Sequence, residues 1–397
     1  MHTDGAQDHL TALDVATGAT LWTLPIGEAY PALNGAEGGP ASTPAIEDDA
    51  VYALSPRGVL VAARLADGRE LWRLPLVERL AVAAPLHGFA TSPLVVGERV
   101  IVVAGGSGGK SVVAVDKATG TIAWAAGDDT AEFASPIPAE LGDVAQVVGI
   151  TDHTVTGFDP ATGTRLWSAP GNEGRNISPT PVLIGADRVL APGWWRSTAL
   201  RIERAEGGLA AREEWQTTDL KGTFAAPVLH EGNLYGFSGA FLTCLSATDG
   251  ARRWKSRAPG GDGLILVDGH LVILGAGGTV VIAEASPVGY RETARLEVFD
   301  RGSRTYPTFA DGRIFVRTTH DIAAVRVVGA NEPHGLLTRL RELARTGWVR
   351  VMRGVRATGR SIVNRVLPLI SEEARHRDGP GEEPGGGASD PQRSPFE

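Results

Sequence analysis

The sequence has almost no cysteine, because Cys244 is the only one among its 397 residues. A single thiol excludes a disulfide within the chain and also the cysteine-based zinc and haem motifs. Long apolar runs are missing too, since no stretch reaches the roughly 18 apolar residues that a membrane-spanning helix needs. The opening residues MHTDGAQDHL have neither the charged start nor the apolar core of a secretory signal. As written, the sequence predicts a soluble, unexported chain.

Positive charge is scarce as well, since 38 lysines and arginines stand against 46 aspartates and glutamates. The net charge of -8 gives no reason to expect a nucleic-acid partner. Glycine, by contrast, is abundant, and its 51 copies exceed the usual share of about 7%. The glycines separate short runs that are rich in Val, Ile, Leu and Thr. That distribution predicts many short strands joined by tight turns.

One motif recurs along the chain, as LTALDVATGATLW at 10–22, VVAVDKATGTIAW at 112–124 and VTGFDPATGTRLW at 155–167. Its aspartate can hydrogen-bond the backbone two residues on, and its glycine supplies the positive φ of a short loop. Each copy therefore predicts a β-hairpin that ends in a tryptophan. The spacing of about 40 to 50 residues is that of a four-stranded propeller blade. The tryptophans are Trp22, Trp72, Trp124, Trp167, Trp215 and Trp254.

A second repeat, offset from the first, supplies the other half of each blade. It reads STPAIEDDAVYAL at 42–54, TSPLVVGERVIVV at 91–103 and AAPVLHEGNLYGF at 225–237, with further copies at 178–191 and 305–317. Each copy has the form proline, apolar run, turn, apolar run, which predicts another hairpin. Two hairpins in each period give four strands per blade.

The strand count leaves two ring sizes open. In the sequence the first blade has only its last two strands, and the last blade lacks a fourth strand. Either the strand that contains Trp22 completes the last blade in a ring of seven, or the ring has eight blades and the first is incomplete. The second arrangement leaves an exposed strand edge, which favours aggregation. We favour eight blades, so the predicted fold is an all-β propeller of four-stranded antiparallel blades over residues 1–330.

The motif LDxATGxxLW, together with GAEGGPASTPAI (35–46) and AEASPVGYRETARLEV (283–298), resembles the pyrroloquinoline-quinone-like (PQQ-like) β-propeller repeat proteins. That group includes quinoprotein alcohol dehydrogenases and the propeller lipoprotein of the bacterial outer-membrane barrel assembly machinery. The resemblance covers residues 9–328 and implies a bacterial protein of the periplasm or cell envelope. Because related chains carry a signal peptide and a first half blade upstream, it also implies that this chain is incomplete at its N-terminus.

The resemblance does not bring a cofactor with it. The quinone-dependent dehydrogenases of the group hold PQQ with calcium through Asp, Glu and Asn near the axis, and commonly cover it with a disulfide between adjacent cysteines. We can match no such set here, and no CxxCH haem motif is present. A shared fold confers no function. The sequence therefore favours a non-catalytic scaffold that binds a protein partner or a small ligand. We predict no cofactor, no metal site and no catalytic residues for it. The alternative is a PQQ- and calcium-dependent alcohol or sugar dehydrogenase.

The loops that lead into the innermost strands should ring the mouth of the central channel. Polar residues break the repeat pattern in these loops, where a pseudo-symmetric scaffold would place specificity. Their other interpretation is that they are solvated loop residues. The ligand-binding candidates are His87, Glu132, Arg175, Asn176, Lys221 and Arg304.

The segment APGWWRSTAL at 191–200 adds Trp194, Trp195 and Arg196 where the repeat has only a turn. Adjacent tryptophans cannot both face one side of a strand, so we expect one of them to be exposed. An exposed Trp beside an Arg is typical of a protein interface, although a cap over the blade edge would serve equally well. The motif tryptophans recur in every blade, so we expect them to pack between blades rather than to carry a quinone.

After Asn331 the apolar period changes from two to 3.6. Residues 331–370 are predicted to form a basic amphipathic helical segment, with eight arginines and one glutamate at 335–370. Such a helix can lie on an anionic membrane surface, or it can pack on the propeller or on a second copy. The tail 371–397 is rich in Pro, Gly and polar residues and is predicted to be disordered.

Overall fold

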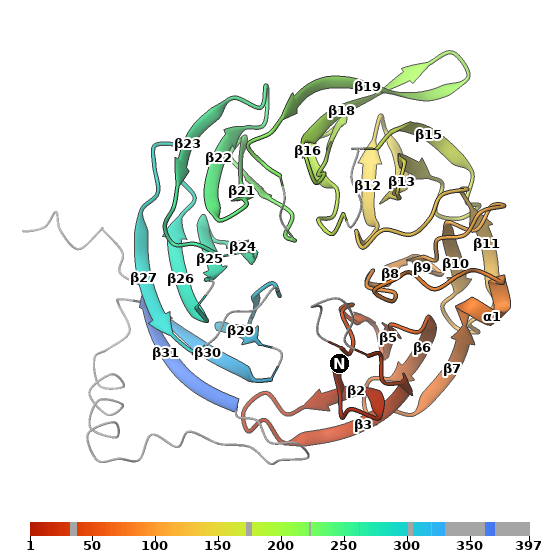
Figure 1. Cartoon of the computed structure of the whole chain (residues 1–397), viewed down its shortest axis with the longest axis horizontal. Helices are drawn as coiled ribbons and strands as arrows, with labels where there is room; N and C mark the ends of the chain where they lie inside the picture. The colour runs from red at the N-terminus through yellow and green to blue at the C-terminus, as the bar shows by residue number, and fades with distance from the viewer. Residues whose placement is uncertain are drawn as a thin grey trace, which may run out of the picture.

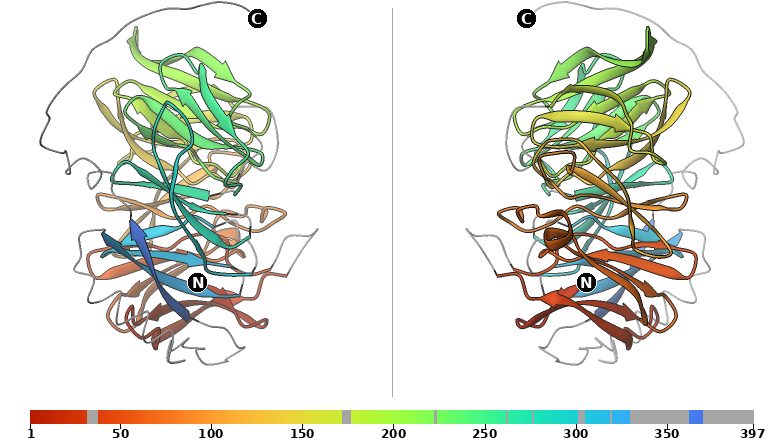
Figure 2. Two further views of the ribbon diagram at one scale, coloured as in Figure 1. Left: turned by 90° about the vertical axis from the view of Figure 1, so that its left-hand side faces the viewer. Right: turned by 90° about the vertical axis from the view of Figure 1, so that its right-hand side faces the viewer.

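The structure, a computed structural model, describes residues 1–31, 38–171, 177–221, 224–261, 263–275, 277–300, 305–318, 320–329 and 362–369. In this part the strands form eight separate sheets, arranged as blades around one axis (Figure 1). The ring is thinner along that axis than across it (Figure 2). The eight-bladed all-β propeller is therefore confirmed, and the seven-bladed alternative is wrong.

The blades follow one another in chain order. Blade 1 has three strands, blades 2 to 4 have four each, and a short helix, α1 Leu76–Leu80, leaves blade 2. The strands of these blades are β1 His2–Thr3, β2 Gln7–Leu13 and β3 Thr20–Glu28; β4 Ala45–Glu47, β5 Ala50–Leu54, β6 Val59–Arg64 and β7 Glu70–Pro75; β8 Leu94–Val96, β9 Arg99–Val103, β10 Val112–Asp116 and β11 Ile122–Ala126; β12 Ile137–Leu141, β13 Val144–Ile150, β14 Thr154–Phe158 and β15 Arg165–Pro170.

Blades 5 to 8 each have four strands in chain order. Their strands are β16 Val182–Gly185, β17 Arg188–Ala191, β18 Ser197–Ala205 and β19 Gly208–Thr217; β20 Val228–His230, β21 Asn233–Ser238, β22 Phe241–Ser246 and β23 Arg252–Ser256; β24 Gly263–Val267, β25 His270–Leu274, β26 Thr279–Glu284 and β27 Glu292–Glu297; β28 Thr308–Ala310, β29 Arg313–Arg317, β30 Ile322–Gly329 and β31 Ile362–Leu369.

The connections alternate between the two faces of the ring, because the strands of a blade are antiparallel neighbours. The links between blades and the turns from the second to the third strand lie on one face, called here the interblade face. The turns from the first to the second strand and from the third to the fourth lie on the other, called the hairpin face. Two hydrogen bonds join a link between blades to a turn from the second to the third strand, so both kinds of connection lie on the same face. Phe89 N–H donates to Pro56 O at 2.9 Å, and Gly239 N–H donates to Lys221 O at 3.1 Å.

Apolar clusters fill the space between neighbouring blades. One cluster joins Leu54 and Leu60 of blade 2 to Val102 and Val113 of blade 3, all of them fully buried. The second and third strands of each blade consist mostly of Val, Ile, Leu and Ala, because neighbouring blades cover both of their faces. No single blade can bury its own apolar faces, and this explains why the sequence repeats.

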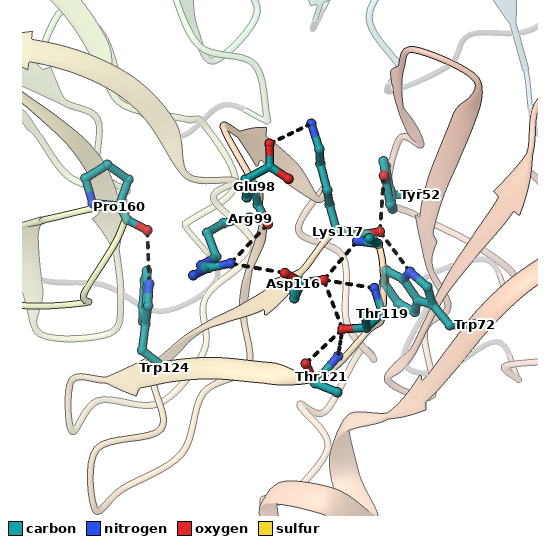
Figure 3. A network of polar contacts seen from close by, with 11 residues as sticks. Tyr52, Trp72, Glu98, Arg99, Asp116, Lys117, Thr119, Thr121, Trp124 and Pro160 are labelled. Atoms are coloured by element: carbon teal, nitrogen blue, oxygen red, sulfur yellow. Dashed lines mark hydrogen bonds and ion pairs between the residues drawn. The ribbon is translucent and has the colours of Figure 1, made fainter.

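The motif tryptophans connect each blade to the next on the hairpin face. Trp72 Nε1 donates to Lys117 O at 2.9 Å, and Trp124 Nε1 donates to Pro160 O at 3.0 Å (Figure 3). The acceptor is the residue after the motif aspartate in the following blade. Both hydrogen bonds join one blade to the next, as the expected packing of these tryptophans between blades requires.

Two of the tryptophans depart from this arrangement. Trp167 Nε1 donates to Gln146 Oε1 of its own blade, because the hairpin of blade 5 replaces the short motif turn with the longer strands β18 and β19. Trp215 Nε1 is buried without a partner. The carbonyl it would meet in blade 6, Ala247 O, instead accepts from Arg188 Nη1 at 3.3 Å.

Blade 8 is completed by β31, a strand that the sequence did not predict. It pairs in parallel with β30, from Ile322 opposite Ile362 to Gly329 opposite Leu369. Over 362–369 the structure therefore differs from the predicted amphipathic helix. Three of these eight residues are β-branched, which favours a strand, and so short a helix is marginal by itself. The other residues of 331–370 and the whole tail 371–397 lie outside the described residues.

Blade 1 remains the incomplete blade that the sequence predicted. It gains only the two-residue strand β1, which pairs His2 with His9 and Thr3 with Asp8. Among the described residues, no helix has the length and apolar content needed to cross a bilayer.

Candidate functional site

Hydroxyl groups tie the interblade loops to one another around the mouth of the channel. In blades 2 to 4 the residue before the proline of the inner strand is involved: Thr43 N–H donates to Ser92 Oγ at 2.9 Å, and Ser92 N–H donates to Ser135 Oγ at 2.8 Å. At the equivalent place in blade 6, Ala226 N–H donates to the hydroxyl of Tyr306 in blade 8 at 2.5 Å. Tyr306 is 41% exposed, and the local desolvation of its hydroxyl raises its pKa to about 12. The loops are therefore held in fixed relative positions.

Two predicted ligand-binding residues lie close together at this mouth. The His87 ring lies 6.0 Å from the ring of Phe133, at an interplanar angle of 57°. Glu132, the neighbour of Phe133, is only 6% exposed, and its Oε2 accepts from Ile177 N–H at 2.7 Å. Because that bond ties the loop before blade 4 to the loop before blade 5, the carboxylate has a structural role in the loop. His87 Nδ1 is buried without a hydrogen-bond partner.

Lys221 is exposed on the interblade face, where its carbonyl accepts from Gly239 N–H at 3.1 Å. The other three predicted ligand-binding residues, Arg175, Asn176 and Arg304, lie outside the described residues.

The predicted partner-contact residues occupy the turn between β17 and β18, also on the interblade face. Trp195 is 61% exposed, whereas Trp194 is half-buried. The expectation that only one of the two would be exposed is met. Arg196 Nε is buried without a hydrogen-bond partner. Ser197 Oγ donates to Leu220 O at 2.6 Å, which fastens this turn beside Lys221.

Three further residues that the sequence did not single out extend this surface. Lys255 Nζ lies 5.0 Å from the ring centroid of Phe241, and Arg257 Cζ lies 5.4 Å from the same centroid. Phe241 begins β22, two residues after Gly239, which is bonded to Lys221. Both cations closely follow the motif tryptophan in RRWKSR (252–257), and that is the only sequence signal that could have found them. We call Trp195, Arg196, Lys221, Phe241, Lys255 and Arg257 the basic aromatic patch.

Charge on the basic aromatic patch is largely uncompensated. Asp219 Oδ1 lies 3.7 Å from Lys255 Nζ and 3.0 Å from Arg252 Nη1. Lys221 and Arg257 have no ion pair with any described residue. Each ring–cation contact has an attraction of about 0.5–1 kcal/mol at an exposed site and holds the long side chains in place. The patch therefore presents fixed positive charge beside exposed aromatic surface.

The described residues do not fit PQQ and calcium. Calcium takes six to eight oxygen ligands, which include carboxylates of Asp and Glu, and no group of three or more His, Cys, Asp or Glu in the described part of the chain could hold a metal ion. At the channel mouth, Glu132 Oε2 accepts from Ile177 N–H. No step of a dehydrogenase reaction can be assigned to these side chains.

Comparison with known proteins gives one family and several similar folds. The family described as outer membrane protein assembly factor BamB matches residues 6–256. BamB from Moraxella catarrhalis is 15% identical, with a TM-score of 0.57 over 79% of this chain and 89% of that one. The computationally designed Ika8 protein is 16% identical, with a TM-score of 0.50 over 78% and 87%.

Quinohemoprotein alcohol dehydrogenase from Comamonas testosteroni is 14% identical, with a TM-score of 0.51 over 78% of this chain and 67% of that one. At these identities the three structures show a shared fold only. No curated protein matches this chain in sequence.

Proposed function

Because the chain belongs to the outer membrane protein assembly factor BamB family, we propose that it is a non-catalytic propeller that binds a protein partner at the bacterial cell envelope. The observation that carries this proposal is the basic aromatic patch, which gathers four segments of blades 5 and 6 on the interblade face: the β17–β18 turn, the loop before β20, the start of β22 and the end of β23. Within the envelope, we propose that the partner is a component of outer-membrane protein assembly.

The composition of the patch fits a protein interface. Trp and Arg are enriched among the residues that dominate binding energy, and they act best where the surrounding surface excludes water. Trp195 is 61% exposed, so a partner that covers it gains the burial of a large aromatic side chain. Arg196 and Lys221 lie beside it on loops that are bonded together, so little ordering is needed on binding.

The charge of the patch defines the chemistry of the partner. Among the described residues Lys255 lies 3.7 Å from Asp219 Oδ1, and no ion pair neutralises Arg196, Lys221 or Arg257. A surface of that sign attracts an acidic surface and speeds its association. We therefore expect a partner that presents Asp or Glu around an apolar side chain, which would cover Trp195.

A photo-cross-linking experiment tests this function. A benzoylphenylalanine is placed at Trp195, and in a second protein at Val288, which is 92% exposed on the opposite, hairpin face. We expect one defined envelope protein to cross-link at position 195 and not at 288, and the product to be lost in the Arg196→Glu background. Equal products at both positions would contradict the proposal.

The alternative dehydrogenase function has its own test. Calorimetric titration of the purified chain with PQQ in the presence of calcium should give no saturable heat. Saturable tight binding would overturn the non-catalytic assignment and would call for assays of alcohols with an artificial electron acceptor.

A further inference from the structure

The outer strand of blade 6, β23, differs in charge from the outer strands of the other blades. Its sequence RRWKS contains three cations and no acid. Among the other described outer strands, β7, β19 and β27 carry both signs, β15 and β31 each have one arginine, β3 has one glutamate and β11 has no charge. The row of cations is therefore a feature of blade 6 and not of the repeat.

The strand β23 also forms a free edge. The sheet of blade 6 ends at β23, which pairs with β22 and with no other described strand, and Figure 1 shows it on the outside of the ring. Alternate backbone N–H and C=O groups of such a strand have no partner within their own sheet. A strand of another chain can pair with them, and then the backbone supplies affinity while the side chains supply specificity.

The cations of this edge are held on the side that faces blade 5. Arg252 Nη1 and Lys255 Nζ lie 3.0 Å and 3.7 Å from Asp219 Oδ1, in the loop that follows blade 5. Lys255 and Arg257 are two residues apart, and both lie against the ring of Phe241. Two acidic side chains that are two residues apart on an added strand share one face in the same way. They would lie beside Lys255 and Arg257.

The edge is continuous with the basic aromatic patch. The strand β23 runs from the hairpin face to the interblade face, because it is the fourth strand of its blade. Lys255 lies near its end and Arg257 follows it directly, and both residues belong to the patch. A strand that is added along β23 therefore reaches the patch at this end.

The charges decide which occupant fits. A second copy of the chain that paired through its own β23 would bring two rows of cations together, and like charges on neighbouring strands are unfavourable. Cations on an edge strand prevent self-association in this way. An acidic strand gains opposite-charge pairs at the same positions, so charge complementarity favours a partner strand that carries Asp or Glu.

We propose that the partner binds through an extended acidic segment, which adds to blade 6 as a strand along β23. This inference rests on the proposed function and names the conformation of the partner segment at the patch. The segment has Asp or Glu at two positions that are two residues apart, beside Lys255 and Arg257.

Fluorescence polarisation of labelled peptides on the full chain tests the charge preference. TVEVEVTLT is the acidic strand, and TVKVKVTLT is its control. We expect the acidic peptide to bind saturably and about tenfold more tightly than the lysine peptide, because opposite-charge pairs replace like-charge pairs. Lys255→Glu should weaken the acidic peptide about tenfold for the same reason. Arg165→Glu, at an exposed position of β15, should leave binding unchanged, and equal urea midpoints will show that both variants fold.

Two methylated forms of the acidic peptide test the backbone pairing separately from the charge. One carries N-methyl groups on its valines, and the other carries them on both glutamates and the threonine that follows them. The N–H groups of a strand point alternately to its two edges, so one form loses the edge that pairs with β23 and the other keeps it. We therefore expect only one of the two forms to bind.

The proposal is overturned if the acidic peptide does not bind saturably or binds no more tightly than the lysine peptide. It is also overturned if the two methylated forms bind equally, or if Lys255→Glu and Arg165→Glu have the same effect. In each of these cases the cross-link at position 195 would still form if the proposed function is right. Loss of that cross-link marks a failure of the proposed function instead, so the two failures are distinguishable.

Discussion

Trp72 lies directly over Gly120 of the next blade, and the indole Nε1 donates to Lys117 O in the same turn at 2.9 Å. A Cβ on Gly120 would come within 2.6 Å of Trp72 Cδ2, closer than any carbon side chain can approach. The same relationship joins Trp124 to Gly163 at 2.6 Å. The motif glycine therefore has two functions: it adopts a positive φ of 71° at position 120, and it leaves room for the tryptophan of the preceding blade.

Gly120→Ala should therefore lower the free energy of unfolding by about 2–4 kcal/mol, since it adds left-handed backbone strain to overpacking against Trp72. Gly232→Ala is the control, because Gly232 has nearly the same φ of 72° and nothing within 4 Å of its added Cβ. The control should cost only the backbone strain, about 1 kcal/mol. Urea unfolding of both variants measures the difference. Equal losses would mean that the tryptophan contact does not constrain the glycine.

The indole hydrogen bond can be separated from indole packing. Trp254 Nε1 donates to Ser286 O at 2.8 Å, whereas Trp215 Nε1 has no partner; both side chains are half-buried. Replacement by Phe removes a hydrogen bond in the first case and an unsatisfied donor in the second. Trp254→Phe should therefore destabilise the chain by about 1 kcal/mol more than Trp215→Phe. A larger loss in Trp215→Phe would contradict the assignment of these bonds.

The motif turns make the stability of the ring dependent on pH. The hydroxyl and then the N–H of Thr119 hold the pKa of Asp116 below its ordinary value, and Thr162 N–H does the same for Asp159. A pKa that is lower in the folded state adds stability above the unfolded-state pKa of about 3.9. That stability is lost as the pH falls through the folded-state value.

Asp116→Asn should therefore be less stable than the parent chain at pH 7, and the difference should shrink on acidification to about pH 3. Thr119→Val, which removes the main hydroxyl donor to Asp116, should show the same trend to a smaller extent. Urea midpoints at the two pH values measure the effect. A difference that stays constant with pH would mean that the Asp116 charge does not stabilise the turn.

Most of the fold could be predicted from the sequence because each blade repeats its own signals. Asp116, Gly120 and Trp124 combine a turn, room for the tryptophan of the preceding blade and packing in one motif. The strand order therefore follows from the spacing of the motif, and the ring size is limited to seven or eight blades. The strand β31 could not be predicted. Its residues fit either an amphipathic helix or a strand, and only the open edge of β30, which is distant in sequence, favours the strand.

The candidate site was less predictable, because its parts come from loops that do not repeat. Trp195 and Lys221 could be found as departures from the repeat, but their proximity depends on the bond between Ser197 Oγ and Leu220 O. Phe241 follows the ordinary pattern at the start of a strand, so only its contacts with Lys255 and Arg257 in three dimensions mark it. Glu132 stays a ligand-binding prediction from its position in the loop, and its burial and its bond to Ile177 N–H became visible only in the structure.

Tyr306 connects the stability of the channel mouth to the proposed patch. Its hydroxyl accepts from Ala226 N–H at 2.5 Å, in the loop that begins at Lys221. Tyr306→Phe leaves that N–H unpaired and should cost about 1–3 kcal/mol. Tyr290→Phe is the matched control, since the Tyr290 hydroxyl bonds side chains and no backbone N–H, donating to Glu292 Oε2 at 2.7 Å, and it should change stability by no more than about 0.5 kcal/mol.

The same variant also tests whether a fixed loop matters for binding. If the patch works because Lys221 is held in place, Tyr306→Phe should reduce the yield of the cross-link at Trp195 although Tyr306 belongs to another blade. Tyr290→Phe should leave the yield unchanged. A full yield in Tyr306→Phe, together with the expected loss of stability, would show that the partner binds without help from the hydroxyl ties at the mouth. Lys221 would then act through its charge alone.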